Sequence, residues 1–227
     1  MATSGTTTFD LNLLEIVEEA FERCGEESRT GYDLRTARRS LNILFLEWAN
    51  RGINLWTVKA GSIAMVADTI TYDLPTDTVD VLDSVIRTGT GTNQSDINVT
   101  RISSTTYTSI PNKNSTGRPL QFWTDRQAGT PTINVWPVPD QSSKYTFIYY
   151  YLRRIEDAGD AGIVTQDVPF RFIPALTAGL AFHLAMKLPN ALERVEMLKA
   201  YYEEQFTLAA DEDREKASLY IVPKVAY

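Results

Sequence analysis

The spacing of apolar and polar residues changes along the chain and divides it into regions. Residues 1–9 are small and polar and predict a loose N-terminal arm. From Leu11 the apolar residues recur every three or four positions, as in amphipathic helices. From Leu55 the period falls to two, which is typical of strands. From Pro174 the helical spacing returns.

Two helices are predicted near the N-terminus. The first is capped by Asp10 and stopped by Gly25, and the second runs from about Asp33 to Asn50. Each carries an apolar stripe that predicts a buried face. The stripes are Leu11, Leu14, Val17, Phe21 and Cys24 in the first helix, and Leu34, Ala37, Leu41, Leu44, Phe45 and Trp48 in the second.

Short strands are predicted through the middle of the chain, with a helical turn at Ser103–Ile110 and a turn-rich linker at Glu156–Asp167. Their β-branched and aromatic residues, separated by turn residues, indicate an antiparallel sandwich or barrel-like sheet. The predicted strands are Trp56–Val58, Thr69–Leu74, Val79–Arg87, Ile97–Ile102, Leu120–Asp125, Ile133–Trp136 and Tyr145–Leu152.

The most apolar stretch predicts a helix from Pro174 to Leu188. Because apolar residues lie on nearly every face, other elements must surround this helix. It is too short and too interrupted by charge to span a membrane. Its small residues, among them Gly179, would let neighbouring helices approach closely. A last helix is predicted from about Ala191 to Ala217, with Tyr202 in its apolar stripe.

Together these elements predict an α+β fold. The simplest assembly joins the N- and C-terminal helix pairs into a four-helix bundle with an inserted antiparallel β-rich lobe. The predicted domains are a flexible arm at 1–9, the helical bundle at 10–54 and 168–217, the β lobe at 55–167, and an extended C-terminal tail at 218–227.

Charge is distributed unevenly between the two N-terminal helices. The whole chain has a formal net charge of −7, which argues against a general nucleic-acid binder but not against a protein that DNA passes. The first helix is acidic on its outer face and the second is basic in its first half, so they favour pairing with each other or with a neighbouring copy. The candidate subunit-interface residues are Glu15, Glu18, Glu22, Arg35, Arg38 and Arg39.

Candidates for catalysis and metal binding are few. His183, the single histidine, has apolar neighbours in sequence and no evident polar partner to orient a catalytic base. Cys24, the single cysteine, lacks the electropositive setting that activates a thiol. One cysteine and one histidine do not make a thiolate and imidazole zinc site. We therefore expect no enzyme, no catalytic residues, no metal and no cofactor.

A cluster of aromatic residues in the predicted β lobe has two interpretations. It could stack bases or sugars, making the protein a small non-enzymatic binding module for nucleic acid or glycan. Alternatively, it forms the core of the sheet together with a contact surface, which the scarcity of nearby basic residues favours. The cluster comprises Phe122, Trp123, Trp136, Tyr145, Phe147, Tyr149, Tyr150 and Tyr151.

The C-terminal tail is apolar, whereas chain ends are usually polar. An exposed apolar run needs a partner, as an added strand or in a groove. The tail could equally fold back onto its own domain, and the residues alone leave both interpretations open. The tail residues concerned are Leu219, Tyr220, Ile221, Val222, Pro223 and Tyr227.

Several short motifs together resemble head-to-tail adaptor (connector) proteins of tailed bacteriophages, especially short-tailed ones. They are Tyr72–Pro75 (YDLP), Gly117–Trp123 (GRPLQFW), Ile133–Asp140 (INVWPVPD), and Val168–Leu176 (VPFRFIPAL) followed by Gly179–Ala181 (GLA). Their order extends the resemblance over most of the chain. None of them is a catalytic motif.

This resemblance implies a structural protein of the virion neck, assembled in the host cytoplasm. Such adaptors form a ring, usually dodecameric, beneath the portal protein, and carry the tail nozzle and fibre proteins. Double-stranded DNA passes through the lumen without sequence specificity, and no membrane is involved. In several of them the C-terminal segment reaches the portal, which corresponds by position to residues 218–227 here. Acidic residues along the lumen would repel DNA phosphates during genome ejection.

Overall fold

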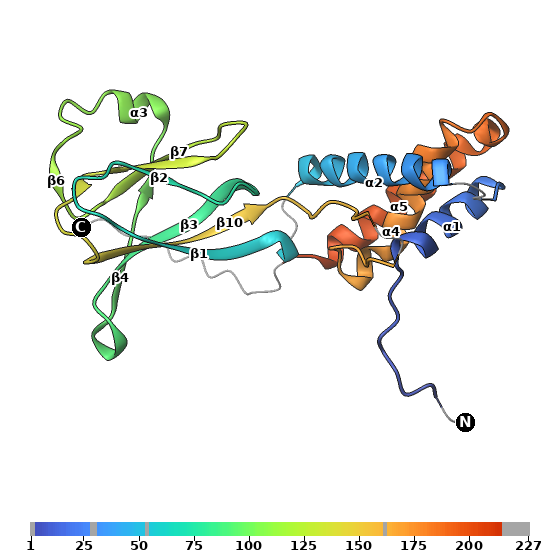
Figure 1. Cartoon of the computed structure of the whole chain (residues 1–227), viewed down its shortest axis with the longest axis horizontal. Helices are drawn as coiled ribbons and strands as arrows, with labels where there is room; N and C mark the ends of the chain where they lie inside the picture. The colour runs from blue at the N-terminus through green and yellow to red at the C-terminus, as the bar shows by residue number, and fades with distance from the viewer. Residues whose placement is uncertain (1–2, 28–30, 53–54, 161–162, 215–227) are drawn as a thin grey trace, which may run out of the picture. The chain divides into compact units, whose positions relative to one another are not determined.

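The computed structural model describes residues 3–27, 31–52, 55–160 and 163–214. The fold is α+β, as predicted, and the chain divides into two compact units (Figure 1). One unit contains residues 1–56 and 155–227 and holds the long helices; the other contains residues 57–154 and holds the sheets. Described segments from both the first and the last part of the sequence therefore build the helical unit.

The helical unit contains four longer α-helices and short 3₁₀ segments in its described part. The helices are α1 (Leu13–Cys24), α2 (Gly31–Arg51), α4 (Ile173–Ala185) and α5 (Val195–Glu212). The 3₁₀ segment η3 (Phe170–Phe172) leads into α4, and η4 (Pro189–Arg194) leads into α5. No helix of the described residues is long and apolar enough to cross a membrane.

Helix α4 is the centre of this unit, as its all-round apolar sequence predicts. It packs against α1, α2 and α5, and ten of its thirteen residues are buried. Gly179 shows how close this packing is. A Cβ atom built there would lie 2.9 Å from Leu44 of α2 and 2.9 Å from Tyr202 of α5.

Helix α1 begins at a different cap from the one predicted. Asn12, not Asp10, caps it: the Asn12 side chain accepts a 3.0 Å hydrogen bond from the backbone N–H of Glu15, whose carboxylate accepts one from Asn12 N–H. This reciprocal capping box fixes the first turn. The buried face also differs from the predicted stripe, since Leu13 is buried and Leu14 is exposed. Gly25 ends the helix with φ 79°, as predicted.

The last helix also departs from its prediction. Residues predicted as its first turn form η4, and α5 begins only at Val195. Leu198, Tyr202 and Phe206 are buried, whereas Leu192 and Leu208 are exposed. The predicted end at Ala217 lies outside the described residues.

The β unit contains two four-stranded sheets and one small pair. The first sheet, in the order β1–β10–β3–β4, is antiparallel throughout. The second has the order β2–β8–β7–β5, and its β5–β7 pair is parallel, as is the separate β6–β9 pair. The expectation of a purely antiparallel lobe is wrong at these two pairs. The strands are β1 (Val58–Ala64), β2 (Thr71–Asp73), β3 (Thr78–Thr88), β4 (Ser95–Asn98), β5 (Thr100–Arg101), β6 (Thr116–Gly117), β7 (Gln121–Asp125), β8 (Thr132–Trp136), β9 (Val138–Pro139) and β10 (Tyr145–Arg153).

Buried side chains from both larger sheets form one hydrophobic core. Phe122 of β7 meets Phe147 of β10 edge-on, with ring centroids 5.4 Å apart. Ile86 of β3 and Ile133 of β8 belong to the same core. The predicted helical turn is confirmed as α3 (Ser104–Thr108), which Ser103 caps.

The segment after β10, which the sequence assigned to the β lobe as a linker, belongs to the helical unit. Ile155 and Ala158 are buried in the helical core. The backbone N–H of Ala158 donates a 2.8 Å hydrogen bond to the Asn42 side chain of α2, and Leu13 N–H donates to Val164 O across 2.9 Å. These buried contacts place the chain's return to the helical unit at residue 155.

Candidate interaction surfaces

The acidic side of α1 retains two carboxylates without an ionic partner among the described residues. Glu15 is engaged in the capping box, and Glu19 pairs with Arg23 at 2.8 Å. Glu18 and Glu22 are exposed, and no described residue forms an ion pair with them. This side of the helix therefore presents negative charge that the described residues of the helical unit do not neutralise.

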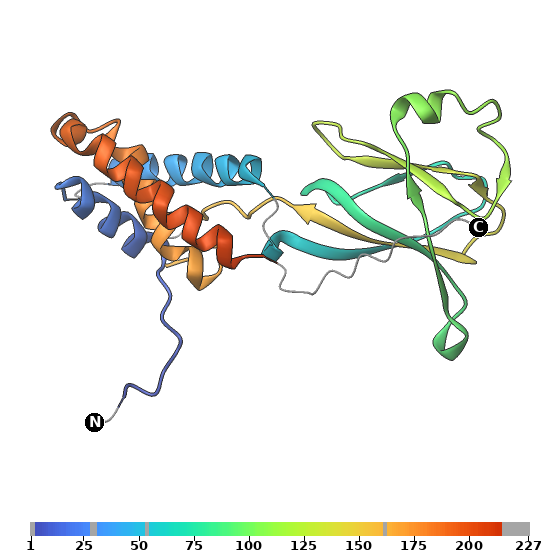
Figure 2. The ribbon, with the colours of Figure 1, turned by 180° about the vertical axis from the view of Figure 1, so that it is seen from behind.

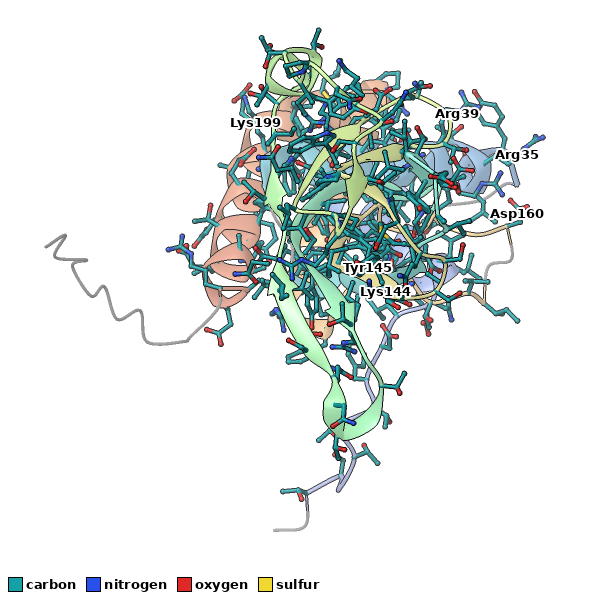
Figure 3. The ribbon with its side chains drawn as sticks, turned by 90° about the vertical axis from the view of Figure 1, so that its left-hand side faces the viewer. Arg35, Arg39, Lys144, Tyr145, Asp160 and Lys199 are labelled. Carbon is teal, nitrogen blue, oxygen red and sulfur yellow. The ribbon has the colours of Figure 1, made fainter. Side chains whose placement is uncertain are left out.

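In the basic half of α2, one arginine forms an ion pair and two others form none with described residues. Arg38 pairs with Asp160 and so ties the segment after β10 to α2. Arg35 and Arg39 are exposed and form no ion pair within the described part of the chain. Figure 3 shows both arginines on the side of the molecule where Asp160 lies. The six predicted interface residues form no ion pair with one another.

A partly exposed polar network joins α2, α4 and α5. Arg51 of α2 binds Glu203 of α5 through two 2.7 Å contacts and Glu47 of its own helix through a 2.5 Å contact. The side-chain hydrogen bond from Arg51 holds the pKa of Glu203 below its ordinary value. The Tyr202 hydroxyl donates to Glu47 across 3.0 Å, and burial raises the Tyr202 pKa.

His183 belongs to this network, contrary to the expectation that it has no polar partner. Its Nε2 lies 3.2 Å from Oε2 of Glu47, and its side chain is 13% exposed. Glu47 is 136 positions away in sequence, so the spacing around His183 gave no signal of it. Of the network's contacts, only the one between Glu47 and Arg51 could have been recognised from the sequence, by their i,i+4 spacing. Because all of these groups bind one another, the network fixes three helices together.

The Cys24 thiol and the Asp80 carboxylate, which could also carry chemistry, make contacts that stabilise the fold. Cys24 is 2% exposed, its Sγ donates to Ala181 O, and burial raises the pKa of its thiol to about 11. Such a thiol is a poor nucleophile at neutral pH. Asp80 binds the Arg101 guanidinium at 2.8 Å. Within the described ranges, no group of three or more His, Cys, Asp or Glu residues could hold a metal ion.

The aromatic cluster of the β unit is mostly interior. Phe122, Tyr145, Phe147, Tyr149 and Tyr151 are buried in the sheet core, while Tyr150 is exposed. Of the two tryptophans, Trp123 stacks on Tyr107 at 5.6 Å and Trp136 donates a 3.0 Å hydrogen bond to Asn112 O. Rings occupied in this way do not form an open stacking platform, so the binding-module interpretation is not favoured.

An apolar hollow at the base of the N-terminal arm was not predicted. It has a volume of about 600 Å³ and is lined by Thr7 and Phe9 of the arm, Phe170 of η3, and Ile173 and Pro174 at the start of α4. Phe9 and Phe170 are each 76% exposed. A second hollow of about 470 Å³ shares Phe9, Ile173 and Pro174 and continues along the acidic side of α1. The signal that the sequence offered was an isolated Phe9 in an otherwise polar arm.

The predicted portal-docking residues lie outside the described residues. They are Leu219, Tyr220, Ile221, Val222, Pro223 and Tyr227. The described chain ends just after α5, where the Asp213 carboxylate pairs with Arg171 and accepts a 2.9 Å hydrogen bond from Leu55 N–H.

Two comparisons with known proteins bear on identity. No curated protein matches the chain. A family model described as SU10 adaptor protein matches residues 11–223, which includes both units and nearly the whole chain. The match supports the resemblance to phage adaptors and leaves the short-tailed type open. The chain belongs to the SU10 adaptor protein family, a family of structural adaptor proteins of bacteriophage virions.

Proposed function

We propose that this protein is a head-to-tail adaptor that forms a ring beneath the portal protein and joins the tail machinery to the capsid. The observation that carries the proposal is the family match over residues 11–223. It covers the helical unit, the β unit and most of the apolar tail. Because the match is not confined to one of the two units, both units take part in the proposed adaptor.

The charge distribution of the helical unit supports a ring. Identical subunits close into a ring through two different faces of one protomer. Glu18 and Glu22 supply an unpaired acidic face, and Arg35 and Arg39 supply an unpaired basic face. In the ring, the acidic face of one copy meets the basic face of the next. Electrostatic complementarity of this kind sets register and specificity more than affinity.

The finer assignments follow from the same proposal. The ring is a dodecamer in the neck of a short-tailed virion, and its helical unit is a four-helix bundle. Residues 218–227 dock on the portal protein, and the ring also carries the nozzle and fibre proteins. The genome passes through an acidic lumen without specific contacts, because like charge keeps phosphates from binding.

The direct test is to mix the purified protein with the portal protein of the same phage and to image the complex by electron microscopy. We expect rings stacked on the portal. A variant that lacks Leu219–Tyr227 should fold, as judged by circular dichroism, and fail to stack. Full stacking by that variant would exclude the tail as the docking segment, and the absence of any complex would overturn the adaptor proposal. A lumen lined by Arg and Lys would contradict the passive passage of DNA.

A further inference from the structure

The apolar hollow at the base of the arm requires a partner. Phe9 and Phe170, which are each 76% exposed, line it together with Ile173 and Pro174. Exposed apolar groups that gather around a cavity mark a binding site far more often than apolar groups scattered singly. We propose that in the free protein the hollow is occupied by the C-terminal segment of the same chain, residues 218–227.

The first argument is the position at which the described chain ends, a few residues before this segment. The Asp213 side chain is 3% exposed and pairs with Arg171, the residue next to Phe170. Figure 2 shows the end of α5 and the start of α4 at the same end of the helical unit, where the arm leaves α1. Residues 214–218 can span roughly 17 Å when extended. The apolar run from Leu219 therefore begins within reach of the hollow.

The second argument is charge. The acidic side of α1 continues from the hollow, since Glu18 and Glu22 line the cavity that shares Phe9 and Pro174 with it. The proposed occupant, residues 218–227, contains Lys224 and no acidic side chain, and Glu215 and Lys216 precede it. An apolar run that carries a lysine matches an apolar hollow that continues into a row of carboxylates.

With the tail bound in the hollow, its apolar side chains would be shielded from water until a partner protein binds the tail. The inference goes beyond the proposed function, because it concerns the protein before assembly and does not depend on which partner later binds the tail. Its test therefore uses the free full-length chain, without portal protein.

Disulfide trapping in solution tests the contact. Thr7→Cys, which leaves the four apolar lining residues intact, is combined with Ile221→Cys. The matched control combines Leu208→Cys with Ile221→Cys. Leu208 is exposed on α5 and closer to the tail in sequence, so random collisions favour the control pair. The native Cys24 does not compete, because its thiol is buried and its pKa is raised.

We expect the Thr7–Ile221 cysteine pair to close within one molecule at least tenfold faster than the control pair, as measured by mass spectrometry and non-reducing electrophoresis at low protein concentration. Adding Phe170→Asp, or Glu18→Gln with Glu22→Gln at low salt, should slow that closure. Equal rates for the two pairs would overturn the proposal. Crosslinks that form mainly between molecules and grow with concentration would overturn it as well, since the occupant would then be a second copy.

Discussion

The indole nitrogen of Trp48 donates a 2.9 Å hydrogen bond to the hydroxyl oxygen of Tyr202, and both residues are fully buried. This contact joins α2 to α5. The same hydroxyl donates to Glu47, so it accepts one hydrogen bond and donates another inside the protein. A buried group satisfied in this way is costly to remove, because its partners are left unpaired.

Replacement of Tyr202 by Phe should lower the free energy of unfolding by about 1–3 kcal/mol, the usual cost of leaving buried polar groups without a partner. Urea denaturation followed by circular dichroism measures the change. Tyr201→Phe is the matched control, because Tyr201 is 40% exposed and its ring remains available to Arg23. A loss of equal size in both variants would show that the Tyr202 hydroxyl contributes no more to the free energy of unfolding than the Tyr201 hydroxyl does.

Replacement of Gly179 by Ala tests the close packing around α4. Alanine has the higher helix propensity, by about 1 kcal/mol. Its Cβ, however, would meet Leu44 and Tyr202 at 2.9 Å, which forces neighbouring side chains or helices apart. Because overpacking typically costs 1–3 kcal/mol, we expect a net loss of stability on thermal unfolding.

The control for Gly179 is Gly31→Ala at the first residue of α2, where an added Cβ meets nothing within 4 Å. This variant should be as stable as the original protein or slightly more stable. A stabilised Gly179→Ala protein would mean that α2 and α5 can move apart from α4 at little cost.

The sequence predicted the parts of this fold that depend on periodicity. The all-round apolar pattern from Pro174 placed α4 at the centre, and the stripe of α2 from Ala37 to Trp48 is buried as predicted. The start of α1 was misplaced because Asp10 and Asn12 are both good caps. Only the contact between Asn12 and Glu15 decides between them.

The network and the hollow could not be predicted in the same way. Glu47 and His183 lie on different helices, so their contact depends on how α2 packs against α4. The hollow likewise combines the arm with residues near position 170. Local patterns give the face that a residue occupies, whereas partners distant in sequence follow from tertiary packing.

The pKa of Cys24 predicts how stability depends on alkaline pH. Burial raises this pKa from 9.0 to about 11 in the folded protein. Between these values the unfolded chain releases the thiol proton first, so the folded state holds more protons and the free energy of unfolding falls as pH rises. Below pH 9 this contribution is fully present.

Cys24→Ala should therefore give a shallower decline of stability between pH 9 and pH 11, measured by urea denaturation at a series of pH values. The native thiol should also react slowly with iodoacetamide at pH 8, and rapidly once the protein is unfolded. An unchanged pH dependence in the variant, or fast alkylation of the folded protein, would contradict the burial of the thiol.

Charge reversal tests whether the acidic and basic faces meet in the ring. Glu18→Lys with Glu22→Lys places like charges opposite Arg35 and Arg39 of the next copy, and juxtaposed like charges are strongly unfavourable at an interface. Ring assembly on the portal protein, followed by analytical ultracentrifugation and electron microscopy, should weaken by roughly tenfold or more. The defect should shrink at high salt, which screens exposed charges.

Restoration by a second reversal makes this test specific. Adding Arg35→Glu and Arg39→Glu to the same chain exchanges the two faces and should recover assembly. The control, Glu196→Lys with Glu204→Lys, makes the same net charge change on exposed positions of α5 and should assemble normally. If the fourfold variant assembles no better than the double variant, these faces do not meet. Equal loss in the control would instead assign the effect to total charge, because only a direct contact makes the outcome depend on which residues carry the reversal.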